Sequence, residues 1–111
     1  MDKGINTINT TGENGWSSLH WAAYKNYVKG VGVLLKWVAD PDLADSDGMT
    51  ALMFACRFGH MKIVELLLCR MRRENINVTN KDGKTALMLA CRFGHMKIVV
   101  LLIRWDANLK E

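Results

Sequence analysis

Residues 50–64 read TALMFACRFGHMKIV, and residues 85–99 repeat this stretch with a single change, Phe54 against Leu89. The two copies start 35 residues apart, and a weaker third copy, SSLHWAAYKNY, occupies residues 17–27. Self-similarity at a period of roughly 20–50 residues is typical of proteins built from stacked structural repeats. The sequence therefore predicts a short array of three repeats.

Each copy predicts a turn, two short helices and an extended connector. In the middle copy Gly48 belongs to a turn signal, Thr50 can cap the helix that follows, and Gly59 can end that helix. A second helix is predicted to begin at His60, with an apolar stripe over residues 63–68. Helices this short are not stable alone in water, so stability must come from stacking one repeat on the next.

Length and composition set the broad class. The chain has 111 residues, half of them apolar, which suits one compact domain. No apolar run is long enough to cross a membrane and the N-terminus lacks a secretory stretch, so we expect an intracellular protein, cytoplasmic or nuclear. Three cysteines suit a reducing compartment. Cys56 and Cys91 are predicted to be small buried residues too far apart to bridge, and Cys69 to be more accessible.

These patterns resemble the ankyrin repeat family over about residues 8–111. The resemblance implies an all-α, ankyrin-like repeat solenoid of stacked helix-turn-helix units with extended hairpin connectors. The predicted divisions are a lead-in over residues 1–14 and repeats over 15–47, 48–82 and 83–111, the last including the start of a following connector. The middle copy carries the match most fully, at Asp45, Gly48, Thr50, Leu52, Ala55, Gly59, His60, Ile63, Val64, Leu66, Leu67 and Leu68.

The sequence departs from the family pattern at several places. Met53 and Met88 replace a histidine, which removes a Thr–His hydrogen bond from the second and third repeats and predicts slightly looser repeats. Residues 70–74 contain a two-residue insertion, which predicts a longer and more mobile connector. Gly30 stands where the other two copies have isoleucine, so a core side chain is missing and the first repeat is expected to be the softest.

The sequence offers no catalytic, cofactor-binding or metal-binding constellation. His20, His60 and His95 belong to different repeats, without a Cys or carboxylate at helical spacing to complete a metal site, so structural roles are favoured. The alternating aspartates of residues 40–47 lack the flanking helices and the distal glutamate of a calcium-binding loop. We therefore predict a protein that is not an enzyme and needs no cofactor.

Charge is distributed unevenly along the chain. Residues 49–104 carry ten Lys or Arg and three Asp or Glu, a net charge of +7, whereas residues 1–48 carry four basic and six acidic groups, a net charge of −2. Such polarity can steer an acidic partner onto the C-terminal repeats, although the same charges would also simply solvate outer helices. Binding of nucleic acid or another polyanion through residues 49–104 is the alternative, and it is disfavoured because no groove-reading motif is present.

The resemblance also implies where a partner would bind. In the family, the two positions before the Gly-His pair and the positions around the turn glycine face a concave surface. Here the former are the Arg-Phe pairs of the second and third copies, of types common at interface hot spots; alternatively, both phenylalanines fold inward. The expected function is a non-catalytic module that binds a protein or peptide, for which an acidic partner would match the charge. The predicted partner-binding residues are Trp16, Tyr24, Lys25, Ser46, Asp47, Met49, Arg57, Phe58, Lys81, Lys84, Arg92 and Phe93.

The last helix predicts an apolar face without a polar capping repeat. Val100 stands where the middle copy has Glu65, and Ile103 follows it. Such a face suits further ankyrin repeats, a bound partner or self-association with another copy. A structural fragment of a larger ankyrin array, with no partner of its own, therefore stays open as a second alternative function.

Overall fold

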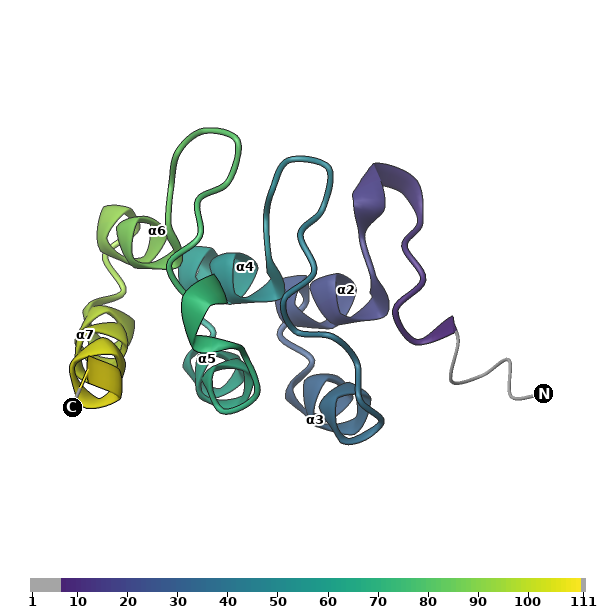
Figure 1. Cartoon of the computed structure of the whole chain (residues 1–111), viewed down its shortest axis with the longest axis horizontal. Helices are drawn as coiled ribbons and strands as arrows, with labels where there is room; N and C mark the ends of the chain where they lie inside the picture. Colours follow the sequence, from purple (N-terminus) through teal and green to yellow (C-terminus); the bar gives the residue numbers. More distant parts are fainter. Residues whose placement is uncertain (1–6, 111) are drawn as a thin grey trace.

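The structure, a computed structural model, describes residues 7–110, with side chains for residues 7–106. The helices form two rows (Figure 1). The inner row contains α2 (Ser18–Tyr24), α4 (Ala51–Phe58) and α6 (Ala86–Arg92), and the outer row contains α3 (Val28–Lys36), α5 (Met61–Leu68) and α7 (Met96–Lys110). Loops before the inner helices project to one side, and we call residues 12–16, 45–49 and 80–84 the first, second and third fingers. This all-helical stack confirms the predicted repeat solenoid.

Helix ends in the middle repeat follow the capping signals of the sequence. The Thr50 hydroxyl accepts a hydrogen bond from the amide of Met53 at 3.2 Å, and Gly59 ends α4 with a positive φ of 76°. Helix α5 begins at Met61, one residue later than predicted, because His60 has the non-helical backbone of an N-cap. The sequence thus places the helices correctly to within one residue here.

Burial is deepest in the middle repeat because α4 packs between α2 and α6. Leu52 and Cys56 are fully buried there. Their counterparts in α6 are not: Leu87 is half-buried and Cys91 is exposed. The prediction of a buried Cys91 is therefore wrong, because among the described residues α6 has an inner helix on one side only. Cys69 is exposed, as predicted.

The last helix also differs from the expected pattern. Residues 109–110 were predicted to start a connector, but α7 continues to Lys110. In the second repeat the chain leaves α5 after Leu68 and buries Met71 and Ile76 against its neighbours, which holds the connector in place. Residues 107–110 are mostly good helix formers, which suits this continuation of the helix. Residue 111, and residues 1–6 of the predicted lead-in, lie outside the described residues.

The inserted connector and the helical glycine both make close contacts. Residues 73–75 form the turn η2 (Arg73–Asn75), and the Arg70 side chain donates to the carbonyl of Leu35 at 3.2 Å. At Gly30, a Cβ atom would lie 3.3 Å from the Cβ of Tyr27 and 3.7 Å from that of Ala22. The nearer contact is to the N-cap residue of α3 itself, and the contact to Ala22 of α2 is an ordinary van der Waals distance. No helix among the described residues is both long and apolar enough to cross a membrane.

Candidate functional site

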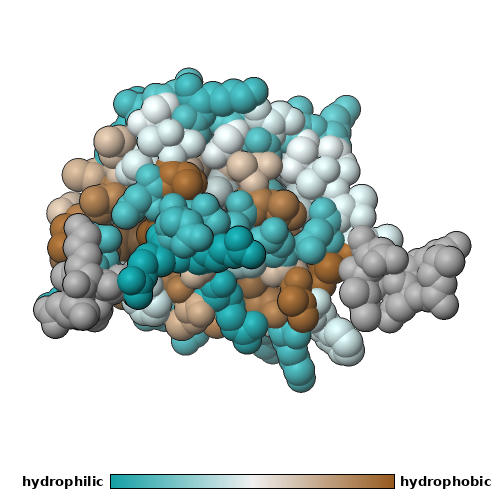
Figure 2. Space-filling model, in the orientation of Figure 1, coloured by the Kyte–Doolittle hydropathy of each residue, from teal (hydrophilic) through white to brown (hydrophobic). Residues whose placement is uncertain are grey.

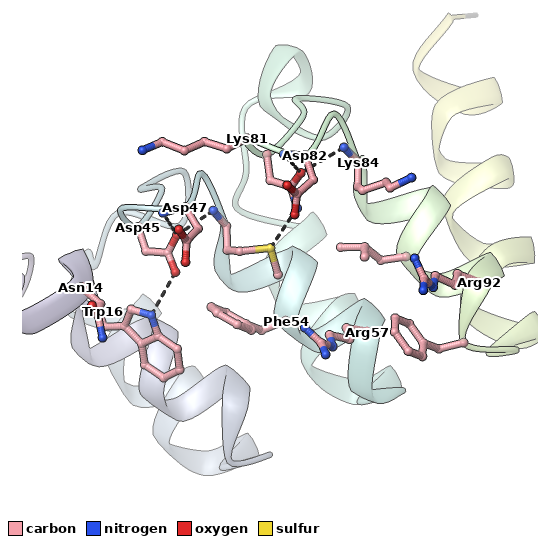
Figure 3. Close-up of a pocket in the computed structure, with 14 residues that line it drawn as sticks. Asn14, Trp16, Asp45, Asp47, Phe54, Arg57, Lys81, Asp82, Lys84 and Arg92 are labelled. Carbon is pink, nitrogen blue, oxygen red and sulfur yellow. Dashed lines mark hydrogen bonds between the residues drawn. The ribbon is translucent and has the colours of Figure 1, made fainter.

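A groove with a volume of about 510 Å³ runs between the fingers and the inner helices. Figure 3 shows the second and third fingers on one side of it and side chains from α4 and α6 on the other. The fingers contribute charged and polar groups together with Trp16 and Met49, and the helices contribute aromatic, apolar and arginine side chains. The groove is lined by Asn14, Trp16, Asp45, Asp47, Met49, Phe54, Arg57, Asn80, Lys81, Asp82, Lys84, Leu89, Arg92 and Phe93.

The second and third fingers are held in the same way. Asp45 Oδ1 accepts hydrogen bonds from the amides of Asp47 and Met49, both at 2.8 Å. Asn80 Oδ1 accepts from the amides of the corresponding residues of the third finger at 2.9 and 3.0 Å. Such Asx bonds replace backbone pairing in tight turns. Because the amide of Lys81 also donates to the carbonyl of Asp47 at 3.0 Å, the two fingers are joined by their backbones.

An aromatic cluster forms the wall of the groove near the first repeat. The Trp16 indole N–H donates to Asp45 Oδ2 at 2.9 Å, and its ring lies 4.8 Å from that of Phe54 between centroids. Trp21 and Tyr24 pack on the other sides of the indole. Asp45 is buried, so its carboxylate is committed to Trp16 and to the turn. Trp16 is therefore a fixed part of the wall.

Two arginines lie along the helical side of the groove. Arg57 and Arg92 come from the last turns of α4 and α6, and their guanidinium carbons lie 5.3 and 5.7 Å from the centroid of the Phe93 ring. Arg57 also lies 5.4 Å from the Phe58 ring. Cation–π contacts of this kind orient a guanidinium without using its N–H donors. Within the described part of the chain, neither arginine forms an ion pair.

His20 links the first repeat to the base of the second finger. Its Nδ1 accepts from the amide of Ser17 at 3.1 Å, and its Nε2 donates to the carbonyl of Met49 at 2.9 Å. The ring is fully buried, and this burial lowers its pKa below the usual 6.5. The neutral ring satisfies both bonds, and the Ser17 hydroxyl also lies 2.8 Å from Nδ1. The contact of the ring with Met49 confirms a structural role for this histidine.

We expect the unfolding free energy to fall as the pH is lowered below about 6.5, because the folded pKa of His20 lies below the unfolded value and the unfolded chain binds more protons. The stabilisation that neutral His20 contributes is complete above pH 6.5, and it is lost as the pH falls from there towards the folded pKa. Urea unfolding at pH 7.5 and 5.5 measures the difference. The variant His20→Gln should be less stable at both pH values, but its unfolding free energy should change less between them. An unchanged difference would mean that other groups cause the pH dependence.

The structure brings eight of the twelve predicted residues to the groove. The other four, Tyr24, Lys25, Ser46 and Phe58, do not line it. The rings of Tyr24 and Phe58 pack against each other at 5.2 Å between centroids, and each remains partly exposed. Met49 is only 8% exposed, with its sulfur 3.2 Å from Asn80 Nδ2, so it forms the floor of the groove and is not the presented side chain that the sequence suggested. For the other eleven of the twelve predicted residues, contact with a partner stays a prediction.

Sequence reasoning missed residues whose signal was present. Phe54 and Leu89 are the single difference between the two near-identical copies, and both line the groove. A position that differs between the two copies while its neighbours stay the same is a candidate for a role that differs between the repeats. Asp45 and Asn80 were missed as groove residues because their place follows from the shape of the fingers. The missed lining residues are Asn14, Asp45, Phe54, Asn80, Asp82 and Leu89.

The remaining titratable groups show no convergent chemistry. Burial raises the pKa of the Cys56 thiol to about 12, so this cysteine stays protonated and unreactive near neutral pH. His95 donates from Nε2 to the carbonyl of Arg57 at 2.9 Å, which ties α7 to the end of α4. Among the described residues, no three His, Cys, Asp or Glu side chains lie together as metal ligands would. The groove, which gathers most of the predicted partner-binding residues, is the candidate binding site.

Comparison with known proteins agrees with the repeat architecture. A family model described as ankyrin repeats in three copies matches residues 19–111. The chain is similar to the E3 ubiquitin-protein ligase XBAT33 of Arabidopsis thaliana, 48% identical over 52 residues, which are 47% of this chain and 10% of that protein. It is also similar to ankyrin repeat domain-containing protein 63 of Homo sapiens, 34% identical over 66 residues, which are 60% of this chain and 17% of that protein. Notch-regulated ankyrin repeat-containing protein B of Danio rerio is 35% identical over 65 residues, 59% of each chain. The chain thus matches about a tenth of the length of the plant ligase.

Proposed function

This chain belongs to the ankyrin repeat family, and from that premise we propose that it is a non-catalytic module that binds an acidic protein segment in the groove. Ankyrin repeats in general mediate protein–protein interaction, and the family is typically non-catalytic. The protein is expected to act in the cytoplasm or the nucleus, in keeping with its odd number of cysteines.

The observation that carries the proposal is the arrangement of Arg57 and Arg92 on the Phe93 ring. Both guanidiniums are oriented by the ring, and neither forms an ion pair among the described residues. A carboxylate of the partner would therefore meet oriented N–H donors, and such charge-assisted bonds are about twice as strong as neutral ones. Apolar side chains beside that carboxylate would pack on Phe54, Leu89 and Phe93.

Binding of a polyanion such as nucleic acid is the alternative. The basic side chains of residues 49–104 are spread over the third finger, α4, α6, the outer helices and the connector around Arg73, and do not follow one track. Since phosphate binding releases counterions, its affinity would fall steeply with salt. The shape of the groove supports binding of a protein segment. The salt dependence of the affinity distinguishes this from binding of a polyanion.

The test compares Arg57→Ala/Arg92→Ala with a matched control, Lys62→Ala/Lys97→Ala. Both pairs remove two positive charges from equivalent positions of the second and third repeats, but the lysines lie on the outer helices α5 and α7. Immobilised wild type and variants are exposed to cell lysate after nuclease treatment, and the retained proteins are quantified. We expect the arginine variant to bind its partner at least tenfold more weakly, about 1.4 kcal/mol or more, and the lysine variant to bind as the wild type does.

Circular dichroism and urea unfolding ensure that the variants are folded. The arginines are exposed and their cation–π contacts contribute about 0.5–1 kcal/mol each, so the fold should survive their loss. Equal loss in both variants would indicate general charge attraction instead of the groove. Retention by the arginine variant would place the partner elsewhere.

A further inference from the structure

The groove contains two equivalent places at which the last residue of one finger meets the first residue of the next. Trp16 ends the first finger, and its indole N–H donates to Asp45, which begins the second finger, at 2.9 Å. Met49 ends the second finger, and its sulfur accepts from the side-chain amide of Asn80, which begins the third finger, at 3.2 Å. The two pairs occupy equivalent positions, so the surroundings of Trp16 and Met49 can be compared directly.

At the first place the chain packs its own aromatic rings around Trp16. The centroid of the indole lies 4.5, 5.3 and 4.8 Å from those of Trp21, Tyr24 and Phe54, respectively. We call these four residues the first site. The place of its central ring is therefore taken by the chain itself.

The equivalent second site keeps one ring instead of four. Its members are the counterparts, in order, of Trp16, Trp21, Tyr24 and Phe54 one repeat further on, namely Met49, Phe54, Arg57 and Leu89. All of them line the groove, whose volume is about 510 Å³. Methionine and leucine are smaller than tryptophan and phenylalanine, so the second site leaves open a space that the first site fills. Figure 3 shows Phe54 and Arg57 bordering this space from α4.

An aromatic ring placed in the second site would find contacts like those that Trp16 has in the first. It would rest on Met49 and Leu89 beside the ring of Phe54. Arg57 can lay its guanidinium on such a ring, as it does on Phe93 at 5.3 Å. Since thioether and guanidinium groups both interact favourably with rings, the second site suits an aromatic side chain better than an aliphatic one.

The charges around the second site determine which residues can flank that ring. Arg57 and Arg92 line the groove from α4 and α6. Figure 2 shows the fingers, along the top of the molecule, as largely hydrophilic. They contribute two lysines and, besides the buried Asp45, the aspartates Asp47 and Asp82. Acidic residues of a ligand therefore meet the arginines on the helical side of the groove, away from these aspartates.

We propose that the second site holds the ring of an aromatic residue of the acidic segment, in the place that Trp16 occupies in the first site. This inference rests on the proposed function and names the residue that the segment carries between its acidic groups. Leu89 is then a specificity-determining residue, because a phenylalanine at its position would fill the second site. Leu89→Phe also gives residues 85–99 the sequence of residues 50–64, so α6 should still form.

Three short peptides with blocked ends, EEFEE, EEAEE and KKFKK, serve as probes. Each is titrated into the isotope-labelled full chain, and Kd is obtained from the shifts of the backbone amide signals. We expect the Kd of EEFEE to be about tenfold or more below that of EEAEE, because the ring leaves water when it enters the second site. The Kd of KKFKK should be about tenfold or more above that of EEFEE, because its lysines face the arginines.

Two variants test whether the second site causes this preference. Leu89→Phe should abolish the preference for EEFEE over EEAEE and leave the Kd of EEAEE unchanged. Met88→Phe is the matched control, since it adds a ring to the same helix at a position that is 52% exposed and does not line the groove. It should keep the preference of the wild type. Circular dichroism checks that both variants are folded.

The outcomes separate this inference from the proposed function. Equal Kd values for EEFEE and EEAEE, with weaker binding of KKFKK, would overturn the inference and leave the acidic ligand of the proposed function standing. A preference that survives Leu89→Phe, or that Met88→Phe also abolishes, would place the ring outside the second site. Binding of KKFKK as tightly as EEFEE, or of none of the three peptides, would contradict the proposed function and the inference with it.

Discussion

Gly48→Ala is expected to lower the unfolding free energy by about 2–4 kcal/mol, and Gly83→Ala at the equivalent position by only about 1–2 kcal/mol. Both glycines have a left-handed backbone, with φ of 78° and 74°, so alanine is strained at either position. The difference lies in the surroundings. A Cβ atom on Gly48 would lie 2.9 Å from Asn80 Cα and 3.1 Å from the amide nitrogen of Lys81, whereas one on Gly83 meets no atom within 4 Å.

Backbone atoms cannot rotate away as a flexible side chain does, so Gly48→Ala must push the third finger from the second. Urea unfolding of the two variants beside the wild type measures the difference, and Gly83→Ala is the control for backbone strain alone. Because the displaced finger carries Lys81 and Lys84, Gly48→Ala should also weaken partner binding. Equal destabilisation of the two variants would mean that the fingers are not in contact at Gly48.

Met53→Ala should cost about 2–5 kcal/mol and Met88→Ala about 0.5 kcal/mol or less. The two methionines follow the same Thr-Ala-Leu sequence at the start of α4 and α6, and their amides are capped alike by Thr50 and Thr85. Met53 is 1% exposed and Met88 is 52% exposed, so truncation leaves a cavity in one case only. Local sequence is thus held constant while burial changes.

Thermal or urea unfolding of the two variants beside the wild type measures this pair. A large effect of Met88→Ala under those conditions would contradict the exposed position of its side chain.

The fold could be predicted from the sequence because the informative signals are local and repeated. Thr50, Gly48 and Gly59 mark the turn, cap and helix end of one unit, and the second copy repeats each of them. The relation between units follows from the same repetition, since each short helix needs a neighbour to cover its apolar side. The predicted order and type of the helices agree with the structure, apart from a one-residue difference at the start of α5 and the continuation of α7 to Lys110 where a connector was predicted.

The errors arise where identical residues have different neighbours. Cys56 and Cys91 have the same local sequence, but only the first has an inner helix on both sides. Met49 belongs to a finger and was expected on the surface, yet the neighbouring finger covers it. Only part of the candidate groove could be predicted, for the same reason. The arginines follow from the repeat pattern, whereas the position of Asp45 depends on its bond to Trp16 of the preceding repeat.

Arg57 belongs at once to the groove and to the contact between the last two repeats. Its guanidinium lies on Phe93, and its carbonyl accepts the hydrogen bond from His95. A ligand that requires both Arg57 and Phe93 can bind only while the third repeat is docked. Ligand binding and docking are then thermodynamically linked. The ligand stabilises the docked state by RT ln(1 + [L]/Kd), and for any substitution that loosens docking the apparent Kd equals the intrinsic Kd divided by the fraction of molecules that remain docked.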